Sequence, residues 1–159
     1  MRKKPNELLI IHLNSRSVLN KTEYLLYIVE VTDADIICLS ESWLDDSTPQ
    51  NCTLVNGYNI IRKDRNEKFK EKYSKSHGGG VAILHKKQIL IEKMNELNDE
   101  IEDILWTRVK AKPSFLLSVV YKPTYSDMIK CENGESILET SLEKAAAKSK
   151  NLLHSRIYE

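Results

Sequence analysis

The chain has 159 residues, which is the size of one domain and argues against a second independent core. Hydrophobic residues make up 41% and charged residues 30%, so the composition excludes wholesale disorder and favours a globular fold. The net charge is +1, so any nucleic-acid binding must come from a local basic patch rather than from the overall charge.

Nothing in the sequence predicts a membrane partner or an extracellular location. The longest apolar stretch, residues 8–13, is too short to span a bilayer, and the basic N-terminus lacks the apolar region of a signal peptide. The three cysteines are far apart and odd in number, so they indicate neither a disulfide framework nor a zinc knuckle. We therefore expect a soluble intracellular protein, and basic residues 2–4 weakly indicate a nuclear one.

The N-terminal third predicts a strand, a helix and a second strand. Residues 8–13 and 36–39 are short apolar runs, which is typical of strands covered on both faces. Between them, residues 20–31 carry apolar side chains at helical spacing, and Asn20 is placed to cap the helix. This spacing predicts a parallel crossover unit and an α/β fold.

The middle of the chain is rich in predicted strands. They are expected at residues 58–61, 81–84, 89–91, 104–109 and 115–121. The later strands have no helix between them, so antiparallel pairing is expected there.

A last helix is predicted at residues 136–155. Ser136 and Glu139 have the spacing of a capping box, and apolar residues up to Leu153 continue an amphipathic pattern. No internal repeat or linker interrupts the chain, which therefore predicts a single domain over residues 1–159.

Three polar side chains lie at the ends of predicted strands, where open α/β sheets usually place their sites. Asn14 follows the first strand, Glu41 follows the second, and Tyr121 ends a later one.

The segments around these residues resemble the endonuclease domains of non-LTR (LINE-type) retrotransposons, which are related to apurinic endonucleases. Five motifs occur in the family's order at suitable spacing, and the resemblance covers about residues 8–124. They are residues 14–17 (NSRS), 35–44 (DIICLSESWL), 57–65 (GYNIIRKDR), 78–83 (GGGVAI) and 119–123 (VVYKP). The resemblance implies the four-layer α/β sandwich of the exonuclease–endonuclease–phosphatase superfamily, of which this chain would supply mainly the first sheet and its flanking helices.

The resemblance also implies roles for the three strand-end residues. Glu41 would be a ligand of a divalent metal, with Mg²⁺ expected, since a hard cation prefers carboxylate oxygen. Asn14 would orient the scissile phosphate or the carboxylate through its amide, and Tyr121 would place a phenol beside the phosphate. The alternatives are an ordinary exposed carboxylate at Glu41, a turn residue at Asn14 and a half-buried strand aromatic at Tyr121.

DNA is the partner that the resemblance implies, and residues 62–75 offer a basic segment for it. Their net charge is +4, and phosphates attract Lys and Arg without sequence preference. Arg62 and Arg65, next to the predicted strand, are the candidates for contact with DNA. For most of the segment, a solvated mobile loop is the favoured interpretation.

Two later motifs of the family do not occur in this sequence. No Asp-x-Asn follows Tyr121, and the late histidine, His154, is not preceded by an aspartate. Members of a catalytic constellation act as a unit, so we expect a C-terminally truncated domain with no meaningful nuclease activity of its own. We also expect an uncovered sheet face that promotes self-association. The alternatives are a non-enzymatic DNA-binding or interaction module, and a gene fragment that does not fold.

Overall fold

The computed structural model describes residues 7–49, 52, 54–73, 78–98, 100, 102–123 and 136–148, and the backbone of 152–158. Within this described part, no helix is long and apolar enough to cross a membrane.

The first sheet has four strands in the order β1-β2-β4-β3. Its strands are β1 (Ile10–Asn14), β2 (Ile36–Ser40), β3 (Tyr58–Lys63) and β4 (Val81–Lys86). Strands β1 and β2 are parallel and are joined by helix α1 (Thr22–Thr32), as the sequence predicts, whereas β4 is antiparallel to both of its neighbours. The parallel pair brings the carboxyl ends of β1 and β2 to the same edge.

The second sheet also has four strands, in the order β5-β6-β7-β8. They are β5 (Ile91–Lys93), β6 (Ile104–Val109), β7 (Phe115–Lys122) and β8 (Leu152–Tyr158). Strands β5, β6 and β7 pair antiparallel, which confirms that expectation, and β8 runs parallel to β7. A short 3-10 turn, η2 (Asn95–Leu97), connects β5 to β6.

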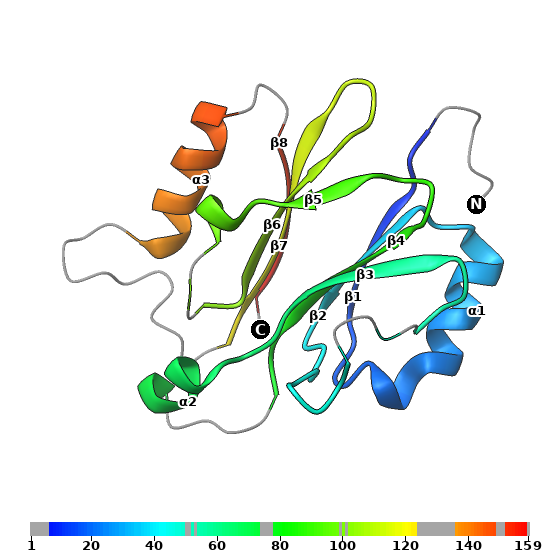
Figure 1. Ribbon diagram of the computed structural model, residues 1–159, viewed down its shortest axis with the longest axis horizontal. Helices are drawn as coiled ribbons and strands as arrows, with labels where there is room; N and C mark the ends of the chain where they lie inside the picture. Colours follow the sequence, from blue (N-terminus) through cyan, green and yellow to red (C-terminus); the bar gives the residue numbers. More distant parts are fainter. Residues whose placement is uncertain are drawn as a thin grey trace.

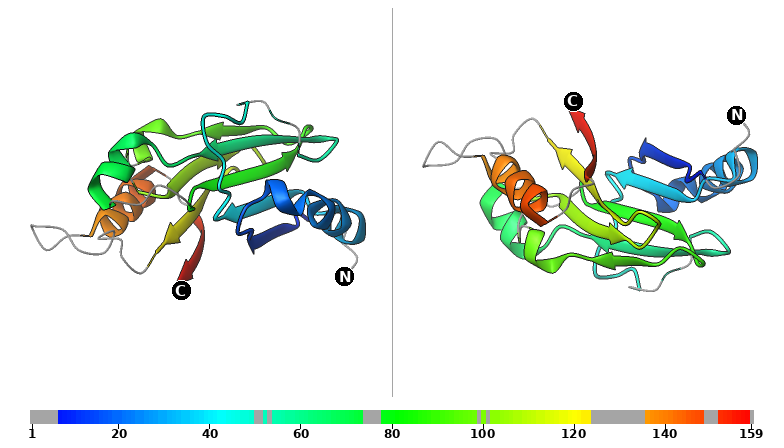
Figure 2. Two further views of the ribbon diagram at one scale, coloured as in Figure 1. Left: turned by 90° about the horizontal axis from the view of Figure 1, so that it is seen from below. Right: turned by 90° about the horizontal axis from the view of Figure 1, so that it is seen from above.

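The two sheets are stacked, with α1 and α3 (Ile137–Lys148) on opposite outer sides (Figures 1 and 2). Three apolar clusters hold the four layers together. One lies between α1 and the first sheet and includes Leu25, Ile37, Leu39 and Leu84. The inner core lies between the sheets and includes Ile36, Cys38, Ile83, Leu105, Leu117 and Val119. The third lies under α3 and includes Trp106, Leu116, Val120, Leu138 and Ala145.

The α/β sandwich class is confirmed, but the chain supplies more of it than expected. We predicted mainly the first sheet, with its inner face uncovered. In the structure that inner face packs on β6 and β7 of the second sheet, and the core residues Ile36, Cys38 and Ile83 are fully buried there. The reason given for self-association is therefore wrong, because the apolar face already has a partner within the chain.

The prediction of one long helix at residues 136–155 is also wrong. Helix α3 ends at Lys148, and β8 follows at Leu152. The capping box is confirmed, because Ser136 Oγ accepts from Glu139 N at 2.9 Å and Glu139 Oε2 accepts from Ser136 N at 3.3 Å. Seven residues of β8 pair with β7, and this long-range pairing overrides the helical spacing of the apolar residues.

Two local predictions need correction. The 3-10 turn η1 (Leu19–Lys21) precedes α1, and Asn20 donates to Ser17 Oγ at 3.1 Å instead of capping the helix. Helix α2 (Glu67–Tyr73) forms within the basic segment that was expected to be a loop. Its Phe69 is fully buried, and the packing of this aromatic side chain holds the helix against the rest of the fold.

Candidate active site

Asn14 and Glu41 lie at the same edge of the first sheet. Asn14 is the last residue of β1 and is in register with Ser40, the last residue of β2, so Glu41 follows immediately beside it. Tyr121 reaches this edge from β7 of the second sheet. The structure thus brings together the three residues predicted from the sequence.

The three side chains meet at one carboxylate oxygen. The hydroxyl of Tyr121 donates to Glu41 Oε1 at 2.6 Å, and Asn14 Nδ2 lies 3.4 Å from the same oxygen. Both Glu41 and Tyr121 are buried. Hydrogen bonds from one strand of each sheet, β1 and β7, fix the orientation of the carboxylate, and charge-assisted bonds of this kind are stronger than neutral ones.

Asn14 has a second contact that agrees with its alternative interpretation. Its Oδ1 accepts a hydrogen bond from Arg16 N at 3.2 Å, which is the pattern of an Asx turn. The turn holds the amide plane, and its Nδ2 then faces Glu41. The turn role and the site role are therefore compatible in this residue.

The backbone of the Glu41 loop is tied to the loop after β1. Glu41 itself has a left-handed conformation with φ of 51°. Its carbonyl accepts from Ser17 N at 3.0 Å and from Ser15 Oγ at 2.9 Å, and Ser42 O accepts from Val18 N at 2.9 Å. These bonds stabilise a conformation that a non-glycine residue rarely adopts.

A second set of bonds ties the same loop to the glycines that precede β4. Ser42 N donates to Gly80 O at 3.2 Å, and Trp43 N donates to Gly79 O at 3.0 Å. Gly80 has φ of 77°, and a β-carbon there would lie 2.8 Å from Ser42 Oγ. Glycine at this position therefore permits the close approach of the two loops.

Arg62 lies inside the fold. Its Nη2 donates to the carbonyls of Thr48 at 2.6 Å and Asp45 at 3.0 Å, its Nη1 lies 3.3 Å from Pro49 O, and Nη2 pairs with Asp64 at 3.0 Å. With this guanidinium buried against the loop after β2, the prediction that it contacts DNA does not fit the structure. A charge in contact with phosphate needs an accessible head group, and this one organises a loop instead.

The side chain of Arg65 is also largely enclosed, and it pairs with Asp103, which immediately precedes β6. The side chains of Arg65 and Asp103 are 7% and 2% exposed, so Arg65 is not placed on a surface that DNA could reach. Of the residues that the sequence predicts for DNA contact, neither therefore lies at the surface.

The donor set at this edge fits a magnesium site with a single protein carboxylate. Across the described ranges, no three His, Cys, Asp or Glu side chains gather into a metal-binding cluster. Mg²⁺ is commonly held by one or two carboxylates, while waters and substrate phosphate complete its coordination. Glu41, oriented by Asn14 and Tyr121, suits that mode of binding, with the remaining ligands coming from outside this set.

One hollow near the first sheet is lined in part by Asn14. It has a volume of about 470 Å³, and its lining includes Ser15, Lys21 and Tyr24. Lys21, four residues after the first family-like motif, contributes a cationic side chain to the lining of this hollow.

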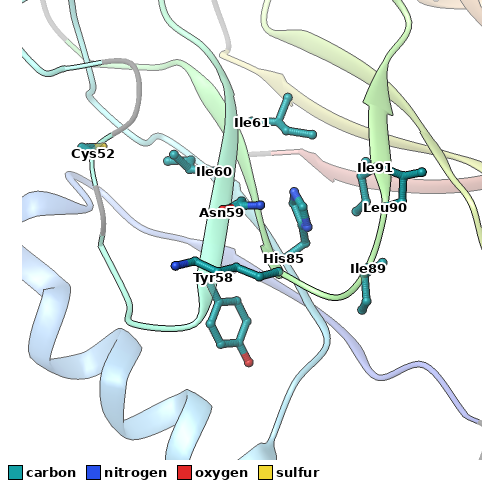
Figure 3. Close-up of a pocket in the computed structure, with 10 residues that line it drawn as sticks. Cys52, Tyr58, Asn59, Ile60, Ile61, His85, Ile89, Leu90 and Ile91 are labelled. Carbon is teal, nitrogen blue, oxygen red and sulfur yellow. The ribbon is translucent and has the colours of Figure 1, made fainter.

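A second hollow, of about 450 Å³, lies at the opposite end of the first sheet (Figure 3). Figure 3 shows Asn59 of β3 beside His85 of β4, the residue in register with Ile36 at the start of β2. Val81, at the other end of β4, pairs with Ser40 next to Glu41. Four residues of extended strand, about 13 Å, therefore separate this hollow from the candidate active site. His85 lines the hollow and is not part of the active site.

Sequence reasoning missed two residues that support the site. Ser15 Oγ donates to the carbonyls of both Ser40 and Glu41, and Asp103 Oδ1 accepts from Gly80 N at 3.2 Å. The only signal for Asp103 was a carboxylate directly before an apolar strand, which by itself does not distinguish a structural residue from a surface one.

Comparison with known proteins identifies the family. The chain matches the Endonuclease/Exonuclease/phosphatase family over residues 11–152. A search of curated proteins gave no match.

Several solved structures share the fold at low sequence identity. They include the endonuclease domain of TRAS1, a telomere-specific non-LTR retrotransposon, with a TM-score of 0.63 at 10% identity, covering 93% of this chain and 57% of that one. An AP endonuclease from Archaeoglobus fulgidus has a TM-score of 0.54 at 18% identity, covering 91% and 53%. The AP endonuclease LMAP from Leishmania major also has a TM-score of 0.54 at 18% identity, covering 75% and 41%. The chain thus spans about half the length of the structures it matches.

The family match covers most of the chain, the two-sheet α/β fold is shared with these structures, and the three strand-end residues singled out in the sequence lie together. The chain therefore belongs to the Endonuclease/Exonuclease/phosphatase family.

Proposed function

We propose that this chain carries part of the active site of a metal-dependent DNA endonuclease of the non-LTR retrotransposon type. The observation that carries the proposal is the convergence of Tyr121 and Asn14 on one oxygen of the Glu41 carboxylate. These residues come from β1, β7 and the loop after β2 and are up to 107 positions apart, so only the folded chain brings them together. The motif resemblance and the fold shared with the TRAS1 endonuclease domain support the retrotransposon branch over others in the family.

Each of the three residues has a distinct task in this proposal. Glu41 holds Mg²⁺ through its carboxylate. When bound, the ion polarises the phosphoryl oxygens and stabilises the leaving oxygen. Asn14 orients the carboxylate or the scissile phosphate with its amide, and Tyr121 donates its hydroxyl hydrogen bond so that the carboxylate stays fixed. Lys21, in the adjacent hollow, offers a cation to the DNA backbone.

The two later motifs to which the family resemblance assigns activation of the attacking water do not occur in this sequence. The 159 residues contain no Asp-x-Asn after Tyr121 and no Asp-His pair. Loss of one member of a catalytic unit commonly lowers the rate by several orders of magnitude. We therefore propose that this chain alone binds the metal but does not cut DNA at a meaningful rate.

Metal binding and plasmid nicking test the two parts of the proposal separately. Binding of Mn²⁺, as a spectroscopic substitute for Mg²⁺, is measured from the loss of the free-ion signal in electron paramagnetic resonance. We expect Glu41→Gln to lower the affinity at least about tenfold, because the mutation removes the charged ligand. Glu30→Gln, an exposed carboxylate on α1, is the matched control and should leave the affinity unchanged.

Supercoiled plasmid incubated with the chain and Mg²⁺ should remain intact. Equal Mn²⁺ binding by the Glu41→Gln variant would overturn the assignment of the metal ligand. Nicking that needs Mg²⁺ and disappears in the Glu41→Gln variant would instead overturn the proposed lack of activity. Salt-sensitive DNA binding without nicking would favour the non-enzymatic binding module.

A further inference from the structure

Arg65 and Asp103 form a buried ion pair directly behind the candidate site. Asp103 Oδ2 accepts from Arg65 Nε at 3.0 Å and from Nη2 at 2.7 Å. The pair links the segment after β3 of the first sheet to the start of β6 in the second. Burial raises the pKa of the Asp103 carboxyl, and the Arg65 guanidinium opposes that effect. A buried ion pair is by itself weak evidence that the pair stabilises the fold. What this pair contacts is more informative about its role.

On one side, the pair supports the strand that carries Tyr121. The carbonyl of Asp103 accepts from Tyr121 N at 3.0 Å. The Arg65 guanidinium lies 5.8 Å from the centre of the Tyr121 ring and 4.0 Å from that of Phe69. The backbone and the ring of Tyr121 are therefore both in contact with this pair, one with each member.

On the other side, the pair supports the glycine loop that precedes β4. Asp103 Oδ1 accepts from Gly80 N at 3.2 Å. Gly79 lies so close to the Arg65 guanidinium that a β-carbon there would be 1.8 Å from Arg65 Cζ. Only glycine permits this approach, so the loop packs directly against the guanidinium of the pair.

The glycine loop in turn holds the loop that carries Glu41. The carbonyls of Gly79 and Gly80 accept from Trp43 N and Ser42 N, the two residues that follow Glu41. Glu41 and Trp43 have φ of 51° and 54°, so this loop needs outside support to keep its conformation. The same ion pair therefore contacts Tyr121 directly and the Glu41 loop through one intermediate loop.

We propose that Arg65 and Asp103 are a positioning pair that fixes Tyr121 and Glu41 relative to each other and so prepares the carboxylate to bind the metal. This inference rests on the proposed metal-binding function of Glu41. It replaces the predicted contact of Arg65 with DNA by a role inside the fold. A pair that served stability alone would affect unfolding but would leave the metal affinity of the folded protein unchanged.

The test compares two adjacent buried carboxylates. Asp103→Asn removes the charge that pairs with Arg65 while keeping the shape of the side chain. Glu102→Gln is the matched control, because Glu102 is fully buried and pairs with Lys72 at 2.9 Å. We expect Asp103→Asn to lower the Mn²⁺ affinity of the full chain roughly tenfold or more, as loss of support for a metal ligand commonly does. Glu102→Gln, which removes a charge paired with Lys72 and not with Arg65, should leave this affinity within about twofold.

Arg65→Lys provides a second variant in case Asp103→Asn does not fold. It keeps the charge but loses the forked contact and the stacking on Phe69, so it should also weaken Mn²⁺ binding. Thermal unfolding followed by circular dichroism is measured for every variant.

Unchanged Mn²⁺ affinity in a folded Asp103→Asn or Arg65→Lys variant would overturn the positioning role while leaving Glu41 as the ligand. An equal loss of affinity in Glu102→Gln would also overturn it, because the effect would then follow from any buried charge. If the wild-type chain does not bind Mn²⁺ at all, the proposed function fails, and the positioning role fails with it.

Discussion

At the scale of single residues, the site depends on unusual backbone conformations that neighbouring loops stabilise. Glu41 and Trp43 are both in the left-handed region, which costs an L-residue roughly 1–2 kcal/mol each. Hydrogen bonds from Ser15 and Ser17 on one side, and to the glycine loop on the other, offset this cost. The orientation of the carboxylate is therefore a property of several short contacts and not of Glu41 alone.

Gly80→Ala should destabilise the protein more than Gly57→Ala. Both glycines have positive φ, 77° and 84°, so both substitutions introduce backbone strain. A β-carbon at position 80 would also lie 2.8 Å from the buried Ser42 Oγ, whereas nothing lies within 4 Å at position 57. We expect Gly80→Ala to lose at least about 1 kcal/mol more free energy of unfolding, measured by urea denaturation, since overpacking adds to the strain. Equal losses would show that the contact with Ser42 relaxes without cost.

At the scale of elements, helix α3, outside the second sheet, is fixed by its N-terminal cap, its apolar face and one polar contact in its middle. Ser136 and Glu139 cap its first turn, and Leu138 and Ala145 are buried against the sheet. Ser141 Oγ accepts from the indole nitrogen of the fully buried Trp106. The cap, the apolar face and this bond together determine where α3 lies.

Ser136→Ala should lower the free energy of unfolding by about 1 kcal/mol, because the first turn of α3 loses its side-chain acceptor. Glu143→Ala, an exposed position on the same helix, is the control and should change the stability by less than about 0.5 kcal/mol. Urea titrations of the two variants provide the comparison. A loss as large in Glu143→Ala would mean that helix propensity, and not the cap, accounts for the effect.

At the scale of the whole molecule, the site exists only because two sheets pack face to face. Glu41 belongs to the edge of the first sheet and Tyr121 to the second, and the inner core between them sets their separation. Two histidines of the first sheet, His12 and His85, each lie two residues along the strand from an isoleucine that packs in that core, Ile10 or Ile83. Residues two apart on a strand face the same side, so both histidines are on the inner face of the sheet. Burial lowers the pKa of both imidazoles below 6.5.

The fold should therefore become less stable as the solution is acidified below about pH 6.5, the pKa of an unfolded histidine. Because the folded pKa values are depressed, the unfolded chain binds more protons in this range, and stability falls as pH falls. The contribution of the two neutral histidines to the free energy of unfolding is complete above about pH 6.5 and is lost once the pH falls below their pKa values in the folded protein. Burial raises the pKa of Asp64 and so acts with the opposite sign.

The test compares the urea midpoints of the wild type and of the double variant His12→Gln, His85→Gln at pH 7.5 and 5.5. Asp64 is present in both proteins, so the difference between them reports the effect of the histidines. The double variant should show a smaller loss of stability on acidification. The same loss in both proteins would assign the acid sensitivity to other groups.

The sequence by itself determined helix α1, the strands from β1 to β7 and which three polar residues to single out. Apolar runs separated by polar turns predicted the strands, because burial on both faces demands continuous apolar side chains. The crossover between β1 and β2 followed from their spacing, and the motifs around Asn14, Glu41 and Tyr121 indicated which polar residues to single out.

The tertiary structure alone decided which segments pair and which charges are buried. The segment at residues 152–158 has apolar residues that also fit a helix, and only the free edge of β7 makes it a strand. Arg62 and Arg65 read as surface charges in a basic segment, yet partners distant in sequence enclose both. Periodicity records how a residue relates to its own neighbours in the chain, whereas the partner of a strand edge or of a buried charge is set by long-range packing.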